Sequence, residues 1–123
     1  MARVLLIDDE TLVLATLSAA LRDAGHEVVE ARDGRRGLAA LAEQPVDLVV
    51  TDILMPERDG IEVILEIRMR WPRLKIIAIS GGDPNDGYDY LPISKRLGAD
   101  RTMTKPFLPA ELVAAVDELL SGA

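Results

Sequence analysis

The chain contains no cysteine, so it can form neither a disulfide framework nor a thiolate metal site. Aromatic residues make up only 3% of its 123 residues, and no apolar run approaches the roughly 18 residues that a membrane-spanning helix needs. Met-Ala-Arg runs directly into a short apolar stretch, so we expect no secretory leader. We therefore expect a cytoplasmic protein that does not associate with membranes.

Acidic residues outnumber basic ones, with 21 Asp and Glu against 14 Lys and Arg, which gives a formal net charge of −7. Because this charge repels nucleic acids and anionic membranes, we do not expect the chain to bind DNA directly. Its length and its hydrophobic content of 49% suit one globular domain with a real core and leave no room for a second. We therefore expect a single domain over residues 1–123.

Five short segments have the character of parallel β-strands. Residues 4–7, 48–50 and 76–79 are continuous apolar runs, which is typical of central strands that are buried on both faces. Residues 27–30 and 101–104 are more polar, as expected of strands at the edges of a sheet. Between these segments, apolar residues recur at helical spacing, for example Leu14, Leu17 and Leu21.

This alternation of strands and helices predicts an α/β protein with a doubly wound, five-stranded parallel sheet. Gly25 and Gly98 stand where helices are expected to stop, and Pro109 suits a first helical turn. A closed eight-stranded barrel needs about 250 residues, so an open sheet is favoured. In such a sheet the ligand site lies beyond the carboxyl ends of the strands.

Polar residues follow the predicted strands at this edge: Asp8 and Asp9, Asp52, Ser80 and Lys105. Three carboxylates brought together would repel one another unless a cation lies between them or their pKa values are raised. An all-oxygen set of ligands favours Mg²⁺, and the backbone carbonyl of Leu54 could add a further ligand. The sequence therefore predicts a magnesium site that also binds a phosphoryl group.

A carboxylate at such a site can attack phosphorus and form an acyl phosphate. Asp52 is the candidate nucleophile, because it directly follows the central apolar strand, which fixes its position. Lys105 is expected to contact the phosphoryl oxygens as a cation, and the Ser80 hydroxyl is expected to donate a hydrogen bond to the same group. Asp8 and Asp9 would hold the metal ion.

Over essentially its whole length, the chain resembles the receiver domains of two-component response regulators, of the stand-alone, single-domain type. The resemblance is carried by four motifs in the family's order, which are Ile7-Asp8-Asp9-Glu10, Thr51-Asp52-Ile53-Leu54-Met55-Pro56 with Asp59-Gly60, Ile79-Ser80-Gly81, and Lys105-Pro106-Phe107. It implies a flavodoxin-like (βα)5 fold with strand order 2-1-3-4-5 and a cis peptide bond before Pro106.

The resemblance also implies the partners and the role of the protein. Asp52 would receive a phosphoryl group from a sensor histidine kinase or a phosphotransfer protein, with Mg²⁺ bound by Asp8, Asp9 and Asp52. The protein would act as a switch and not as an enzyme, although it would assist its own phosphotransfer and slow dephosphorylation. Because no output domain follows the last predicted helix, we expect the signal to pass to another protein, and we expect a monomer or a weak dimer.

Two features depart from the family pattern. Receiver domains commonly carry Tyr or Phe three residues before the lysine, whereas this chain has Thr102. Residues 81–87 are rich in residues that break regular structure, so we expect a mobile loop that phosphorylation orders, in place of a moving aromatic ring. Leu54 and Gly82 are apolar or small and cannot position a hydrolytic water, which predicts a slowly hydrolysed aspartyl phosphate.

Two other functions stay open. A degenerate receiver would act as an interaction module independent of phosphorylation, which Thr102 allows although all five site positions are filled. A small phosphatase with an aspartate nucleophile normally needs a second acid two residues later, where this chain has Leu54. His26, the one histidine, is expected to be a solvated residue without a chemical role.

Overall fold

The computed structural model describes residues 2–53, 59–80 and 98–121. The strands are β1 (Arg3–Ile7), β2 (Glu27–Ala31), β3 (Leu48–Asp52), β4 (Lys75–Ser80) and β5 (Arg101–Thr104). The helices in these ranges are α1 (Thr11–Asp23), α2 (Gly34–Glu43), α3 (Asp59–Arg70) and α5 (Pro109–Leu120). In this described part of the chain, none of the helices combines the length and the apolar character needed to cross a bilayer.

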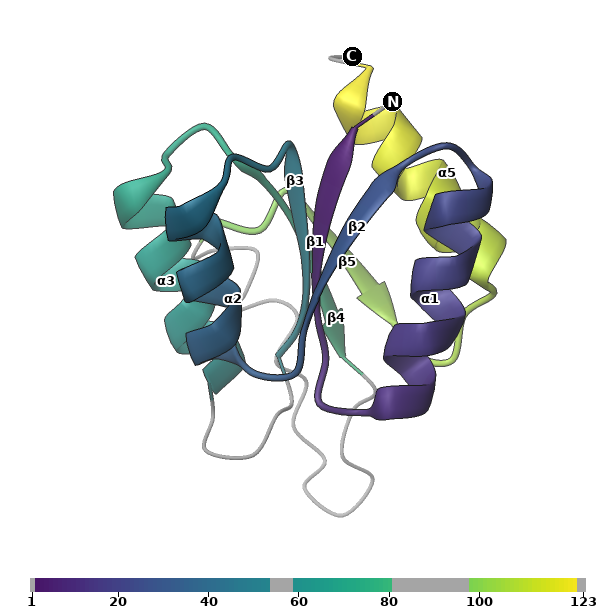
Figure 1. Ribbon diagram of the computed structural model, residues 1–123, viewed down its shortest axis with the longest axis horizontal. Coiled ribbons are helices and arrows are strands. Elements are labelled where there is room, and N and C mark those ends of the chain that lie inside the picture. The colour runs from purple at the N-terminus through teal and green to yellow at the C-terminus, as the bar shows by residue number, and fades with distance from the viewer. Residues whose placement is uncertain (1, 54–58, 81–97, 122–123) are drawn as a thin grey trace.

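The five strands form one parallel sheet in the order β2-β1-β3-β4-β5. The predicted fold and strand order are therefore confirmed, and the two more polar strands, β2 and β5, lie at the edges. Helices α1 and α5 cover one face of the sheet, and α2 and α3 cover the other (Figure 1). All five strands point the same way, so their carboxyl ends meet at one edge, beside the start of α1 (Figure 1).

The central strands are apolar throughout because each of their faces packs against helices. In β1, Leu5 and Ile7 belong to the core cluster beneath α2 and α3, whereas Val4 and Leu6 belong to the cluster beneath α1 and α5. All four side chains are fully buried. This alternation follows from the two-residue period of a strand, and it explains why a run without polar residues predicted a central strand.

Several boundaries agree with the sequence signals. Gly25 follows α1 with a φ of 96°, a conformation that glycine adopts without steric cost. Pro109 occupies the first turn of α5, as expected. The Asp33 side chain caps α2 by accepting a hydrogen bond from the backbone N–H of Arg36 at 2.8 Å.

His26 is not the solvated residue that the sequence suggested. Its side chain is largely buried, and its Nε2 lies 2.9 Å from Oδ1 of Asp117 in α5. The interaction joins the turn before β2 to α5 across 91 residues of sequence. The expectation was wrong because the partner of His26, Asp117, comes from the other end of the chain.

Candidate functional site

Acidic side chains gather at the carboxyl edge of the sheet because β1 and β3 are neighbours. Ile7 pairs with Thr51 in the strand register, so the next residues, Asp8 and Asp52, leave adjacent strands side by side. Both are buried, with 1% and 3% of their surface exposed. One carboxylate oxygen from each of four residues lies within 4.8 Å of the others: Asp8, Asp9, Glu10 and Asp52.

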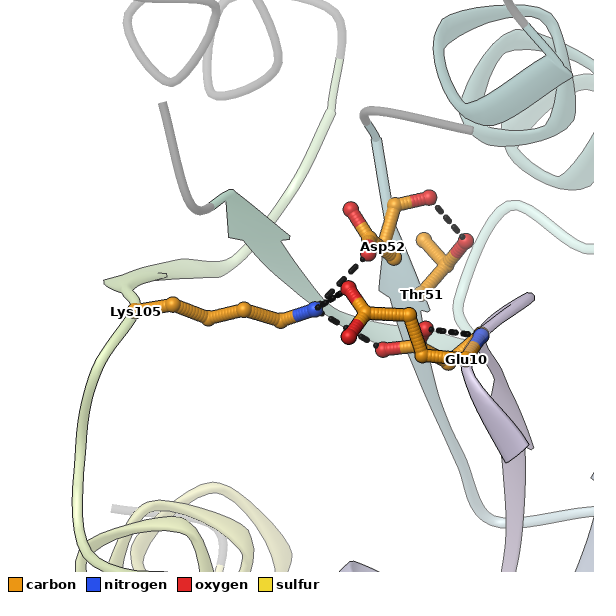
Figure 2. A network of polar contacts seen from close by, with 5 residues as sticks. Glu10, Thr51, Asp52 and Lys105 are labelled. Carbon is orange, nitrogen blue, oxygen red and sulfur yellow. Dashed lines mark hydrogen bonds and ion pairs between the residues drawn. The ribbon is translucent and has the colours of Figure 1, made fainter. Parts of the chain in front are cut away.

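Lys105 brings a positive charge into this cluster from the segment after β5. Its Nζ lies 2.9 Å from Oδ2 of Asp52, 3.1 Å from Oδ2 of Asp8 and 3.5 Å from Oε1 of Glu10. Figure 2 shows the ammonium group pointing between the carboxylates of Glu10 and Asp52. The Lys105–Pro106 peptide bond is cis, as the resemblance implied.

Backbone hydrogen bonds fix the groups that carry these charges. The Glu10 N–H donates to Oδ1 of Asp8 at 2.9 Å, which leaves Oδ2 of Asp8 facing Lys105. The Asp8 N–H donates to the carbonyl of Ala31 at 3.1 Å, and the Lys105 N–H donates to the carbonyl of Ser80 at 2.9 Å. These hydrogen bonds tie Asp8 and Lys105 to the ends of neighbouring strands.

The electrostatics of the cluster favour a bound cation. Partial burial alone would lower the pKa of Lys105, but the hydrogen bond and charge of Asp52, followed by those of Asp8, outweigh it and raise that pKa well above its usual range. The pKa of Asp9 is raised because its carboxylate is partly desolvated and because Asp8 and then Glu10 add negative charge. Asp8, Glu10 and Asp52 thus contact one ammonium group, with Asp9 in the same cluster, so negative charge is in excess and a bound cation would offset it.

The arrangement of acids and lysine on this fold agrees with the comparison of the sequence with known families. The family model of the response regulator receiver domain matches residues 4–117. The chain belongs to this family. The chain spans about half the length of the curated relatives that it matches.

Two relatives and two solved structures illustrate the similarity. The receiver domain is 34% identical to the alkaline phosphatase synthesis transcriptional regulatory protein PhoP of Bacillus subtilis, over 96% of this chain and 48% of the relative. It is 38% identical to the transcriptional regulatory protein PrrA of Mycobacterium tuberculosis, over 96% of this chain and 49% of the relative.

Among solved structures, a CheY-like receiver domain protein from Methanospirillum hungatei superimposes with a TM-score of 0.89 at 28% identity, over 99% of this chain and 95% of that one. The chemotaxis response regulator CheY4 of Vibrio cholerae gives a TM-score of 0.85 at 30% identity, over 97% and 98% of the two chains. Both are covered almost completely, which is the relation expected between one receiver domain and another.

Ser80 of the receiver domain ends β4 at the same edge, between the strands that carry Asp52 and Lys105. Asp52 pairs with Ile79 in the register, so Ser80 lies one residue beyond that pair, and it is buried. Thr102, at the position where the family commonly has an aromatic ring, is half-buried in β5 and pairs with Ala78. The predictions for Leu54, Gly82 and residues 81–87 fall outside the described residues.

The sequence-based site omitted Glu10, although its side chain reaches Lys105. The signal was present, because Glu10 extends the acidic run that begins at Asp8. Within the described ranges, these acids form the one group of three or more potential metal ligands. Carboxylate oxygens are hard donors of the kind that Mg²⁺ prefers, so the residues present fit the metal ion that receiver domains bind.

Proposed function

We propose that this receiver domain accepts a phosphoryl group on Asp52 in a Mg²⁺-dependent reaction. The observation that carries the proposal is the position of Asp52, which is held at the end of the central strand with the Lys105 ammonium 2.9 Å away. A carboxylate in that position is a fixed nucleophile, and the lysine is placed to balance charge on a transferring group. Membership of the family supports a phosphohistidine on a sensor kinase or phosphotransfer protein as the donor.

In the proposed step, one carboxylate oxygen of Asp52 attacks the phosphorus atom. The new P–O bond forms as the P–N bond to the histidine breaks, and the electron pair of that bond stays on the imidazole nitrogen, which takes up a proton. Mg²⁺, when bound, supplies charge neutralisation for the phosphoryl group. Asp8, Asp9 and Asp52 would hold the ion, and the Leu54 carbonyl remains a predicted ligand.

Lys105 and Ser80 would report the arrival of the phosphoryl group to the rest of the fold. The Lys105 ammonium would give up a carboxylate contact and bind a phosphoryl oxygen. The Ser80 hydroxyl would donate a hydrogen bond to another oxygen of the same phosphoryl group. These two residues are already joined, because the Lys105 N–H donates to the Ser80 carbonyl. A movement of either would therefore shift the ends of β4 and β5 together, which is a route for the signal to a partner protein.

The names of the relatives support a pathway that ends in the control of transcription. The net charge of −7 favours a protein partner over direct contact of this chain with nucleic acid. That the chain works as a stand-alone domain, as a monomer or weak dimer in the cytoplasm, remains part of the proposal.

A second candidate is an interaction module that works without phosphorylation. It is favoured by Thr102, because a threonine cannot replace the movement of an aromatic ring. Fluoroberyllate, which mimics a phosphoryl group on an aspartate, is added to the Mg²⁺-loaded protein to decide between the phosphorylated switch and the interaction module. Shifts in the amide spectrum of β4 and β5 support the switch, whereas failure to bind the mimic favours the interaction module.

The proposed function is tested by incubating the protein with acetyl phosphate and following the intact mass. We expect the wild type to gain one phosphoryl group slowly when Mg²⁺ is present and none when it is chelated. The Asp52→Asn variant should gain none in either condition. Equal phosphorylation of the wild type and Asp52→Asn would refute the proposal.

A further inference from the structure

Glu10 occupies a position from which a side chain usually caps a helix, but it is not used in that way. It precedes the first turn of α1, and its side chain makes no capping hydrogen bond. Instead its Oε1 lies 3.5 Å from Nζ of Lys105 (Figure 2). The side chain is 61% exposed, in contrast to the buried Asp8 and Asp52, so Glu10 stands at the rim of the site.

The ammonium group of Lys105 has three N–H donors, and three carboxylates surround it. Asp8 and Asp52 cannot keep their bonds to Lys105 unchanged while the same oxygens bind a divalent cation, because an ammonium group and a dication repel each other at such short range. Lys105 then needs another acceptor. Glu10 is the carboxylate of the three that lies on the solvent side, away from the buried pair.

We propose that Glu10 is a positioning residue that holds Lys105 at the rim of the site while Asp8 and Asp52 bind the metal ion. The inference rests on the proposed function, because it assigns Glu10 a part in preparing the same site. The negative charge of Glu10 also attracts the metal ion and repels an anionic phosphoryl donor. Glu10 therefore favours metal binding at the expense of rapid reaction with small phosphoryl donors.

This dual action predicts two opposite effects for Glu10→Gln. The affinity for Mg²⁺ should fall by about 3- to 10-fold, the size expected from one charge acting over a few ångströms near a surface. At saturating Mg²⁺, the rate of phosphorylation by acetyl phosphate should rise by roughly 2- to 5-fold, because Lys105 is released and the donor is repelled less. Damage to the fold would lower both quantities, so the opposite signs identify the positioning role.

The affinity is measured without any phosphoryl donor, from amide shifts in ¹H–¹⁵N spectra as Mg²⁺ is added. Glu43→Gln is the matched control, because it removes the same charge from an exposed residue at the end of α2, at the opposite edge of the sheet (Figure 1). The control should bind Mg²⁺ and react as the wild type does. Equal Mg²⁺ affinities of Glu10→Gln and Glu43→Gln would overturn the inference.

A double-mutant cycle tests whether Glu10 acts through Lys105. In a Lys105→Met background, the effect of Glu10→Gln on Mg²⁺ affinity should shrink to about half or less, since only the direct attraction of the cation remains. An undiminished effect would overturn the positioning role.

The outcomes also separate this inference from the proposed function. If the wild type is phosphorylated on Asp52 but the two glutamate variants do not differ, the inference fails and the function stands. If the wild type is not phosphorylated, the function fails, and the Mg²⁺ titrations still decide the role of Glu10.

Discussion

The Lys105 ammonium lies 2.9 Å from Oδ2 of Asp52, although the two residues are 53 positions apart in the chain. Asp52 ends β3 and Lys105 follows β5, so β4 must lie correctly between them for the contact to form. The contact therefore exists only in the completed sheet. It links the stability of the fold to the electrostatics of the site.

Lys105→Met should destabilise the metal-free protein by about 2–4 kcal/mol, because it leaves the charges of Asp8 and Asp52 buried without their shared cation. Added Mg²⁺ should recover most of the loss by taking over that neutralisation. Urea denaturation with and without Mg²⁺ measures both effects. Lys75→Met is the control, since Lys75 forms no ion pair within the described residues, and an equal loss in both variants would contradict the account.

Asp9→Asn should stabilise the metal-free protein at pH 7. Since folding raises the pKa of Asp9, ionised Asp9 costs stability at all pH values above that raised pKa. The advantage of Asn should fade as the pH falls through the raised pKa and vanish below 3.8, where Asp9 is protonated in both states. Thermal melts of both proteins between pH 3 and pH 7 test this, and a difference that grows on acidification would be the wrong sign.

Gly37→Ala should destabilise the fold by about 1–3 kcal/mol, although alanine is the better helix former. A Cβ at this position would lie 2.4 Å from Cδ1 of Ile7, which is fully buried in β1. The close approach of α2 to β1 thus depends on the absent side chain. Ile7→Val removes the contacting methyl group, so the double variant should lose less than the two single losses combined, as denaturant titration can measure.

Arg68→Lys should lower the free energy of unfolding by about 2 kcal/mol. The Arg68 guanidinium donates to the carbonyl oxygens of Pro72, Leu74 and Gly98, which ties α3 to the segments that lead into β4 and β5. A lysine keeps the charge but cannot reach all three acceptors. Arg35→Lys, at an exposed position on α2, is the matched control and should change stability by less than about 0.5 kcal/mol.

The sheet and its acidic edge could be predicted from the sequence because both follow from local patterns. A continuous apolar run such as residues 4–7 can be buried only between two layers of helices, and its position fixes that of Asp8. Parallel strands then bring Asp8 and Asp52 to the same edge without any knowledge of side-chain conformation. The place of Lys105 followed from the same rule and from the family motif.

Other contacts could not be predicted because they depend on side chains that meet across the fold. Glu10 reaches Lys105 across 95 residues of sequence, so the contact forms only once the two distant segments have folded together. His26 was interpreted as solvated because nothing near it in the sequence indicates Asp117. In each case the residue type was compatible with the contact, and Glu10 also extends an acidic run, but nothing in the sequence identified the partner residue.

The most direct test of the central claim is peptide mass spectrometry that locates the phosphoryl group after incubation with acetyl phosphate and Mg²⁺. The account predicts a single modified residue, Asp52, and no modification when Mg²⁺ is chelated or when Asp52 is replaced by Asn. A phosphoryl group on another residue, or a wild-type protein that stays unmodified under these conditions, would contradict it.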